Sequence, residues 1–473
     1  MPKSKALLRS GSAVAFARLF SLVCAAVQLP LLTNLLSPGE YSAIAIAIAI
    51  ATYFNLLSAE PIILGFERFP GTKANRVNYR YAMNRTLLHI GVATVVVLII
   101  ALPMGLLNQA VAFIGWGIGI AINRLISLTW LMWEEPWQYA WNLTAGTGAR
   151  TAVLVSLIVL GWDPLLSLGL AGIASAVAAL CLSPRVRHAA IALRPRAGGR
   201  GVKRPRPWPF RFGLNLAFAS LGYTLLTNAN LLILALFVSD DSVGAYAVML
   251  QVATLTSGAV LGLVLAVAYP PLRRRWDEGA QEMVRGRLRL LQLLSIAVAT
   301  AFIFICYVGD GFLLRLVFPS DYIEVAVLAP LVLGTAFATM GGMASWHHQL
   351  HLESARVARR TVVAAAVGIS GTLLLTMALH EQGAAAGSLL GFLLYLVIMQ
   401  AGTRLPISTI AFAVVAAVAT SAMFFVPSAS SNFVSIPALA VFSFALVTLW
   451  RAYRKASAST ESVVLFEHDR PAD

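Results

Sequence analysis

The sequence predicts an all-α polytopic membrane protein, and two observations carry that prediction. Of the 473 residues, 59% are hydrophobic and only 12% are charged, with a mean hydropathy of +0.80. A soluble domain has about 25% charged residues, and no soluble core could hide this much apolar surface, so lipid must cover it. In addition, apolar runs of about 20 residues, the length that crosses a bilayer, follow one another along the chain. These features exclude a secreted disulfide scaffold, a disordered chain and a soluble multidomain enzyme.

The apolar runs between polar breaks predict about fourteen transmembrane helices. The break at Gly161-Trp162-Asp163-Pro164 alone divides the fifth run from the sixth. The expected spans are 10–36, 41–66, 86–107, 110–132, 144–161, 164–183, 211–238, 243–269, 289–308, 322–346, 361–380, 384–402, 406–426 and 432–450.

The basic residues predict the sides of the membrane. With a cytoplasmic N-terminus and alternating spans, all but three of the 35 Lys and Arg residues fall on the cytoplasmic side, Arg150 among them. The exceptions are Arg315, on the external side, and Arg18 and Arg124, within spans. This partition follows the positive-inside rule. We therefore expect both termini in the cytoplasm. The protein is expected in the inner membrane of a bacterium, because Arg greatly outnumbers Lys and Ala is abundant, as in GC-rich genomes.

A basic linker divides the expected helices into two bundles. Residues 184–210 are rich in Arg, Pro and Gly and are expected to lie on anionic headgroups. This linker joins a six-helix bundle at 1–183 to a second at 211–402, followed by two additional transmembrane helices within 403–455 and a cytoplasmic tail at 456–473. Six is an even number, so both bundles would insert in the same orientation, related by a pseudo-twofold axis along the membrane normal. That arrangement is typical of transporters.

Motifs of catalysis and of cofactor binding are missing from the sequence. It has no Gly-rich phosphate loop, metalloprotease motif or nucleophile elbow, so we expect neither an enzyme nor a cofactor. The cysteines are scattered and predict no disulfide framework. His347 and His351 have a spacing that zinc could use, but no third ligand is evident, so we expect a polar helix end and no metal site. Nucleic acid is not expected either, because no basic groove with interleaved aromatic residues occurs.

Charged residues inside the spans are the candidate site. A charge at the centre of a span costs roughly 2.5–3.5 kcal/mol on insertion scales, so it usually faces a cavity or a partner. Arg18 and Arg124 lie about 13 and 15 Å into their spans, and Glu60 lies at a similar depth beside Pro61. We interpret them as a cationic patch, partly balanced by Glu60, that lines an inward-facing cavity and suits phosphate oxygens. Alternatively, the arginines extend to the interface, or one pairs with Glu60 to hold helices together.

Amides form a second candidate group, in the seventh and eighth spans. Asn215, Asn228, Asn230 and Gln251 could bind sugar hydroxyls or join helices, and the sequence does not separate these two roles. The tryptophans of the fourth span and its end, Trp116, Trp130 and Trp133, are interpreted as interfacial anchors.

Four motifs carry a resemblance to a known family. Between the first two spans stands Leu35-Leu36-Ser37-Pro38-Gly39-Glu40-Tyr41. The second half contains Val243-Gly244-Ala245-Tyr246, Phe318-Pro319-Ser320-Asp321-Tyr322 and Gly383-Ala384-Ala385-Ala386-Gly387. With these motifs the chain resembles the polysaccharide-transporter family of lipid-linked oligosaccharide flippases. Their superfamily also holds multidrug/cation antiporters and lipid II flippases.

The resemblance implies a flippase that moves an undecaprenyl-diphosphate-linked oligosaccharide from the cytoplasmic to the external leaflet by alternating access, for surface polysaccharide or exopolysaccharide biosynthesis. It gives Arg18 and Arg124 the role of meeting the diphosphate. The implied partners are this substrate and membrane lipids, with a polysaccharide polymerase or export machinery as a further candidate. Many relatives carry an acidic residue near the position of Asn230, and that departure puts proton or sodium coupling in doubt.

The alternative is a multidrug/cation antiporter of the same superfamily. Ion coupling would need buried carboxylates, and beyond Glu60 the spans offer almost none. Arg18 and Arg124 would also repel cationic drugs. A membrane-bound glycan polymerase or ligase is disfavoured because the longest expected external segment, 309–321, is too short for a catalytic domain.

Overall fold

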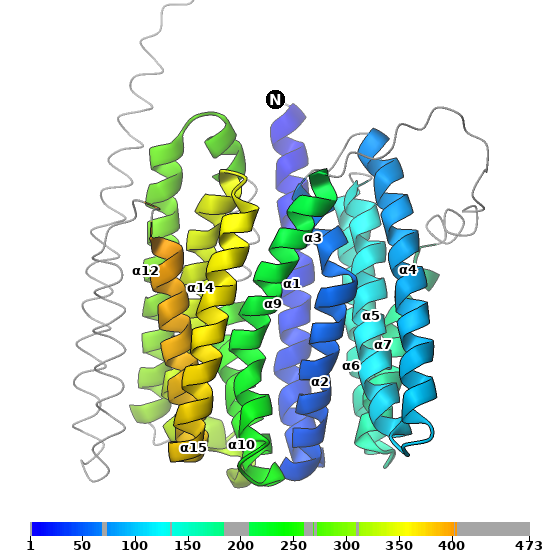
Figure 1. Ribbon diagram of the computed structural model, residues 1–473, viewed down its shortest axis with the longest axis vertical. Coiled ribbons are helices and arrows are strands. Elements are labelled where there is room, and N and C mark those ends of the chain that lie inside the picture. The colour runs from blue at the N-terminus through cyan, green and yellow to red at the C-terminus, as the bar shows by residue number, and fades with distance from the viewer. Residues whose placement is uncertain are drawn as a thin grey trace, which may run out of the picture. The chain divides into compact units, whose positions relative to one another are not determined.

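The computed structural model confirms the all-helical membrane fold (Figure 1). It describes residues 2–68, 73–132, 135–183, 208–259, 268, 272–308, 312–401 and 403, and these ranges contain helices and turns without a strand. Within them, nine helices are long and apolar enough to cross a membrane. The expected spans 406–426 and 432–450, the tail and nearly all of the linker lie outside the described residues.

Each of the first twelve expected spans contains described helical residues, but the span at 41–66 is divided between α2 and α3, and residues 260–267 and 269 of the span at 243–269 lie outside the described residues. The two spans at 361–380 and 384–402 form one element, α15, which reverses at His380, where the backbone is non-helical (φ 51°, ψ −124°). The elements are α1 (Pro2–Leu35), α2 (Pro38–Ser58), α3 (Glu60–Arg68), α4 (Lys73–Ala101), α5 (Leu107–Met132), α6 (Pro136–Val159), α7 (Pro164–Cys181), α9 (Trp208–Leu234), α10 (Asp240–Ala253), the π-helix η1 (Thr254–Ala259), α12 (Gln281–Val308), α13 (Phe312–Arg315), the 3₁₀ helix η2 (Ser320–Tyr322), α14 (Val325–Leu350) and α15 (Ser354–Gln400).

Local sequence explains where several helices begin. Ser37 and Glu40 form a capping box at the start of α2, in which each side chain pairs with the backbone N–H of the other residue, and Pro38 occupies the first turn. At the start of α7, the Asp163 carboxylate accepts a hydrogen bond from Leu166 N at 2.8 Å. By contrast, α4, α6 and α12 begin 8 to 13 residues earlier than expected, because their first turns are polar and hydropathy does not detect them.

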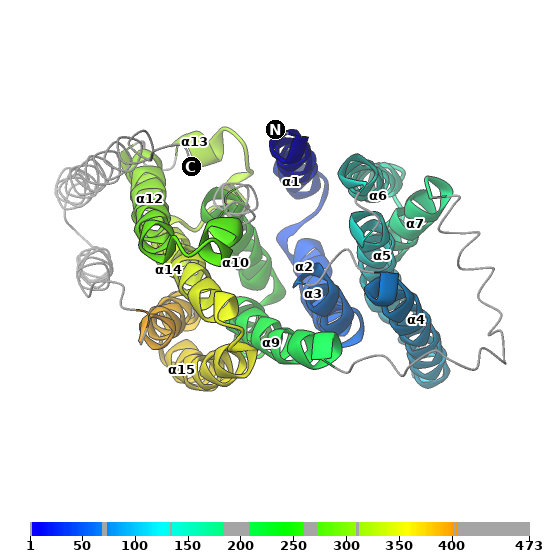
Figure 2. The same cartoon turned by 90° about the horizontal axis from the view of Figure 1, so that it is seen from above.

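Helix contacts divide the chain into two compact units. Unit 1 comprises residues 1–248, 318–322 and 354–365, and unit 2 comprises 249–317, 323–353 and 366–473. In unit 1, α5 packs on α7, α6 packs between α1 and α7, and α3 packs on α9 (Figure 2). In unit 2, α12 packs on α14, and 83% of the α14 span is buried. The division into two six-helix bundles remains a prediction, and α9 is grouped with unit 1.

Glycines bring the backbones of α5 and α7 together. A Cβ built on Gly119 would lie 1.9 Å from the carbonyl oxygen of Gly172, and one built on Gly115 would lie 2.3 Å from that of Gly169. No side chain fits between these helices. Small residues at such positions let transmembrane helices approach closely, which maximises van der Waals contact in lipid.

We predict that Gly119→Ala lowers the melting temperature of the purified protein in detergent. The added methyl group overlaps the Gly172 carbonyl, and overpacking of this kind costs about 1–3 kcal/mol. Gly91→Ala is the matched control, because a Cβ there meets nothing within 4 Å and its helix propensity improves by about 1 kcal/mol. Equal melting temperatures for the two variants would contradict the close approach of α5 and α7.

Candidate functional site

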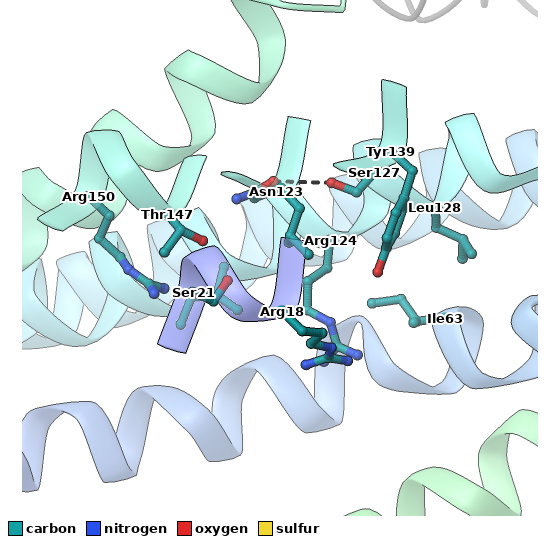
Figure 3. Close-up of a pocket in the computed structure, with 12 residues that line it drawn as sticks. Arg18, Ser21, Ile63, Asn123, Arg124, Ser127, Leu128, Tyr139, Thr147 and Arg150 are labelled. Atoms are coloured by element: carbon teal, nitrogen blue, oxygen red, sulfur yellow. Dashed lines mark hydrogen bonds between the residues drawn. The ribbon is translucent and has the colours of Figure 1, made fainter. Parts of the chain in front are cut away.

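A polar cavity of about 290 Å³ lies in unit 1 between α1, α3, α5 and α6 (Figure 3). Three arginines face it from three different helices: Arg18 from α1, Arg124 from α5 and Arg150 from α6. Hydrogen-bonding side chains make up most of the remaining wall, namely Ser21, Asn123, Ser127, Tyr139 and Thr147. The cavity is therefore strongly cationic and lined with hydrogen-bonding groups, although the helices around it are otherwise apolar.

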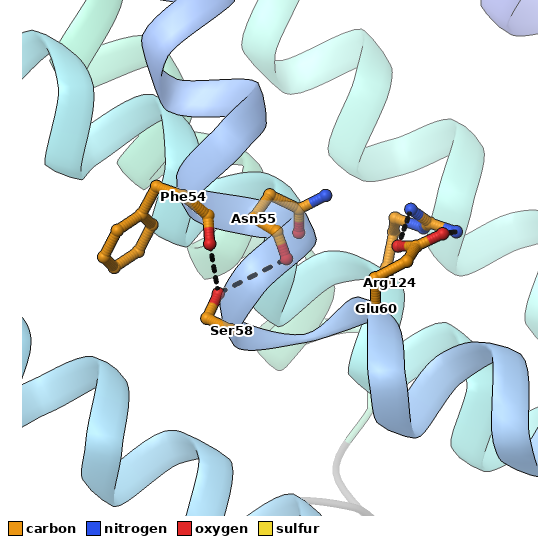
Figure 4. Close-up of polar contacts among 5 residues, drawn as sticks. All are labelled: Phe54, Asn55, Ser58, Glu60 and Arg124. Carbon is orange, nitrogen blue, oxygen red and sulfur yellow. Dashed lines mark hydrogen bonds and ion pairs between the residues drawn. The ribbon is translucent and has the colours of Figure 1, made fainter. Parts of the chain in front are cut away.

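Arg124 forms a bidentate ion pair with Glu60 (Figure 4). Its two terminal nitrogens lie 2.5 and 3.2 Å from the two carboxylate oxygens, the fork geometry in which Arg and carboxylate bind most strongly. The Glu60 side chain is 7% exposed and that of Arg124 is 32% exposed. The pair combines both interpretations of the sequence, since Glu60 holds two helices together and Arg124 still lines the cavity.

A break between α2 and α3 aims Glu60 at Arg124. The sequence predicted one continuous span at 41–66, but α2 ends at Ser58 and α3 begins at Glu60. Pro61 has no backbone N–H and cannot continue the helical hydrogen bonds of α2. The Ser58 hydroxyl takes part in closing α2, by donating to the carbonyl of Phe54 at 2.8 Å. The break turns the carboxylate toward α5 (Figure 4).

The first turns of α3 rest directly on the backbone of α9. A Cβ on Gly213 would lie 2.0 Å from the carbonyl oxygen of Pro61 and 2.6 Å from the amide nitrogen of Gly65. Gly213 is therefore required for this approach. The contact joins the helix that carries Glu60 to α9 without an intervening side chain.

Arg18 and Arg150 differ from Arg124 in their partners. Among the described residues, Arg18 has no ion pair, and its side chain points into the cavity (Figure 3). The guanidinium of Arg150 lies 4.6 Å from the ring centre of Trp116, a cation–π distance, and its Nε has no hydrogen-bond partner within the described part of the chain. Arg150 lies apart from Arg124, beyond Thr147 (Figure 3).

Two expectations are wrong at this point. Arg150 was counted with the cytoplasmic residues although it follows the expected start of its span at 144, and α6, which extends from Pro136 to Val159, places it well inside the helix. Trp116 and Trp130 were interpreted as interfacial anchors, but they are only 5% and 3% exposed. Trp116 stacks against Arg150, and the Trp130 indole donates to the Ser183 hydroxyl at 2.9 Å. Both rings are therefore structural parts of the bundle interior.

A buried polar network holds the wall of the cavity in place. Its centre is Asn142 of α6, whose amide donates to the Ser183 hydroxyl at 2.6 Å and to the Ala179 carbonyl at 2.9 Å. Ser127 of α5 donates to the amide oxygens of Asn142 and of Asn123, at 3.1 and 3.2 Å. The network continues from Asn123 to Ser175 of α7, so it joins α5, α6 and α7 behind Arg124. Neither Asn142 nor Asn123 was a candidate from the sequence.

The four amides predicted for the second half do not line this cavity. Asn215 donates to the Ser354 hydroxyl at 3.2 Å, and Asn230 donates to the Tyr246 hydroxyl at 2.8 Å. These two amides therefore join helices. Asn228 is half-buried in α9, and Gln251 lies near the end of α10.

Three of the sequence motifs meet at one end of unit 1. The Tyr322 hydroxyl donates to the Leu36 carbonyl at 2.7 Å, and its ring packs edge-on against Tyr41, with ring centres 6.0 Å apart. A Cβ on Gly244 would lie 1.9 Å from the Pro38 carbonyl oxygen, so only glycine fits there. The motifs at 35–41, 243–246 and 318–322 thus form one packed junction.

Acidic residues surround this junction. Burial raises the pKa of Tyr322, and the nearby carboxylates of Glu40, Asp241 and Asp321 raise it further. The phenol therefore stays protonated at physiological pH, as its hydrogen bond to the backbone requires.

Comparisons with known proteins agree with the fold and with the resemblance seen in the sequence. Residues 152–327 match a family described as polysaccharide biosynthesis protein. The fold is similar to that of the lipid II flippase MurJ in an inward closed conformation, with a TM-score of 0.55 and 11% identity over 94% of this chain and 99% of that one. It is also similar to the inward-facing conformation of a multidrug resistance MATE family transporter of the MOP superfamily, with a TM-score of 0.60 and 14% identity over 84% and 99% of the two chains. A search of curated protein sequences finds no match.

We predict that Glu60 and Arg124 are strongly coupled in a double-mutant cycle. Glu60→Gln and Arg124→Met should each lower the free energy of unfolding in mixed micelles, and the double variant should recover part of the loss. The expected coupling is about 1–3 kcal/mol, because each single change leaves a charge uncompensated in the bundle interior.

The control cycle uses Arg274 and Glu278, an exposed pair at a similar distance of 2.7 Å. Its expected coupling is below about 1 kcal/mol, since exposed ion pairs gain little. Equal coupling in the two cycles would show that the Glu60–Arg124 pair behaves as a solvated surface pair.

Proposed function

We propose that the chain is a flippase that moves a diphosphate-linked oligosaccharide lipid across the membrane for surface polysaccharide biosynthesis. The observation that carries the proposal is the cavity with Arg18, Arg124 and Arg150 inside apolar helices. A cavity with three guanidinium groups favours an anionic ligand, and arginine matches phosphate oxygens with paired N–H donors. The match to a polysaccharide biosynthesis family supports a glycan-linked substrate.

The arginines would divide the work of binding the diphosphate. Arg18 is available to a ligand without breaking an ion pair. Arg124 lines the cavity with a side chain that is 32% exposed, and Glu60 neutralises its charge. Phosphate oxygens would compete with the Glu60 carboxylate for Arg124, and Glu60 balances part of the cationic charge of the wall.

The rest of the cavity suits the sugar next to the diphosphate. Its volume of about 290 Å³ is at the lower end for ligand pockets, which range from about 300 to 1,000 Å³. It would therefore enclose the diphosphate and an adjoining sugar rather than a whole glycan. Ser21, Asn123 and Thr147 supply the hydrogen bonds that sugar hydroxyls need.

A multidrug/cation antiporter is the second candidate function, supported by the MATE-like fold. The cavity argues against it. Among the residues that the structure describes, the carboxylate of Glu60 is already bound to Arg124, and the arginines of the wall would repel a cationic drug.

We further propose that the protein lies in the bacterial inner membrane with both termini in the cytoplasm, as the distribution of Lys and Arg indicates. The lipid substrate would then enter the cavity from the cytoplasmic leaflet. A polysaccharide polymerase or export machinery would receive it on the external side.

Arg18→Ala should reduce surface polysaccharide at least tenfold and trap the lipid-linked intermediate on the cytoplasmic face. The loss of one guanidinium removes charge-assisted hydrogen bonds to the diphosphate. Surface glycan and the radiolabelled intermediate, resolved by leaflet, give the readout. Arg274→Ala, at an exposed position far along the chain, is the control.

The membrane levels and melting temperatures of both variants must match those of the wild type. A loss of surface polysaccharide is then a loss of transport and not of folding. Normal export by Arg18→Ala, or unchanged glycan with altered sensitivity to cationic drugs, would refute the flippase assignment.

Cysteine labelling tests the proposed orientation. In a background without Cys24, Cys181 and Cys306, Ala197→Cys in the linker should react with impermeant maleimide only after permeabilisation. Ser320→Cys, in an exposed turn of the opposite side, should react in intact cells. Labelling of Ala197→Cys in intact cells would invert the orientation.

A further inference from the structure

A group of titratable residues that the cavity does not use lies in unit 2, where α14 ends and turns into α15. His347, His348 and His351 occupy the end of α14, and Glu353 directly precedes α15. The residues that the structure describes contain no group of three or more His, Cys, Asp or Glu side chains that could hold a metal ion. The cluster therefore has to be explained by another chemistry.

The turn between α14 and α15 places Glu353 against His348. The Glu353 amide donates to the His348 carbonyl at 2.9 Å, and the Leu352 amide donates to the Gln349 carbonyl at 3.0 Å. Leu352 has a left-handed backbone with φ 63°. Together these bonds form a Schellman motif, in which the second residue after the C-cap His351 meets the third-last helical residue. That contact is usually hydrophobic, but here it joins a carboxylate and an imidazole.

Both nitrogens of the His348 ring face hydrogen-bond acceptors. Nδ1 lies 3.0 Å from Glu353 Oε2, and Nε2 lies 3.3 Å from the carbonyl oxygen of Met399, in the last turn of α15. The His348 side chain is 2% exposed, whereas that of Glu353 is 38% exposed. The ring therefore lies between the end of α14, the turn and the far end of α15.

These contacts require one proton more than a neutral histidine and an ionised carboxylate provide. A neutral imidazole has a single N–H, so it can donate to one acceptor only. Both contacts are hydrogen bonds when the ring is doubly protonated, with Nδ1–H donating to the Glu353 carboxylate and Nε2–H donating to the Met399 carbonyl. Without that proton, a lone pair of Nδ1 would face a carboxylate oxygen, or Nε2 would face the Met399 carbonyl, and one contact would become repulsive.

We propose that His348 and Glu353 form a proton-binding site that fastens the α14–α15 turn to the C-terminal end of α15. With the proton bound, His348 connects Glu353 to Met399. Its release breaks one of the two contacts and frees the turn from the end of α15. The half-exposed carboxylate of Glu353 gives the buried ring a route for exchange with water.

The surrounding charges act on this site in opposite directions. The Glu353 carboxylate stabilises the protonated ring. His347 and His351 belong to the same helix end, and the rings of His347 and His348 are 5.8 Å apart. Arg285 of α12 acts electrostatically on His347, and Trp276 contributes an uncharged ring against His347 and His351. The positive charge of Arg285 therefore opposes the proton that the Glu353 carboxylate favours.

Histidine NMR measures the proton directly. The protein is labelled with ¹⁵N in its imidazole rings, placed in lipid bilayers and titrated from pH 6 to 9. The signal of His348 is the one that disappears in the variant His348→Gln. We expect a ring that is doubly protonated at pH 7.5, at which an ordinary histidine, with a pKa of about 6.5, is mostly neutral. Glu353→Gln should lower its proton affinity at least tenfold, and His351→Gln should leave it within about threefold of the wild type.

A neutral His348 ring at pH 6.5 in the wild type, or equal proton affinities in the wild type and Glu353→Gln, would overturn the proposal. If Glu353→Gln does not fold, Glu353→Asp gives the same test, because it withdraws the carboxylate by one methylene. Melting curves alone would not identify the His348 site, because a second group makes the stability depend on pH in the same range. Burial and the nearby Glu381 carboxylate raise the pKa of Glu324 to about 7. That group also contributes stability that is present below its ordinary pKa and is lost as the pH rises through 7.

Spin labels test the structural consequence. Labels at Gln349 and Ala401 report on the turn and on the chain after α15. Their distance should increase between pH 6 and 9 in the wild-type background, and it should be long at both values in His348→Gln. A distance that does not change with pH in the wild-type background would overturn the fastening role. The site does not depend on the proposed transport function, so neither experiment requires the substrate.

Discussion

The ion pair between Glu60 and Arg124 is the interaction on which the architecture of unit 1 depends. A charge inside apolar helices must be paired or face water, and this pair does both, with a carboxylate that is 7% exposed and a guanidinium that is 32% exposed. The geometry requires α2 to end at Ser58, so that α3 can present Glu60 to α5. It also requires α5 to be held in position. The glycine contacts with α7 and the polar network around Asn142 do this from behind.

The polar network shows how helices select their packing partners in a membrane, where no hydrophobic driving force acts between them. In lipid, apolar side chains do not distinguish a neighbouring helix from an acyl chain. Hydrogen bonds from Asn142 to Ser183 and Ala179 do distinguish them, because an unpaired amide in this environment is costly. Together with the close approach of Gly119 to Gly172, they fix which faces of α5, α6 and α7 meet. The cavity wall inherits its shape from these contacts.

Hydropathy and charge predicted the fold class and twelve of the spans, because lipid imposes one length and one composition on every crossing helix. They also found Arg18, Arg124 and Glu60, because charges in apolar runs are visible as exceptions. Arg150 was missed because it follows the expected start of its span at 144 closely enough to be counted with the loop residues, whereas α6 begins eight residues earlier, at Pro136. Asn123 and Asn142 were missed for a different reason: a buried amide differs from a surface amide only in its partners, which the sequence does not show.

The contact between Gly213 and the first turns of α3 has a mechanical consequence. Side chains between two helices normally absorb small displacements by changing rotamer, and the movement is lost within a few ångströms. Here the Pro61 carbonyl and the Gly65 amide lie against a bare backbone, which has no rotamers to change. A shift of the helix that carries Glu60 must therefore either move α9 by the same amount or open a gap between them, and a gap forfeits van der Waals contact along the whole seam. The two helices are therefore expected to move together, and a displacement of the Glu60 carboxylate would be transmitted to α9.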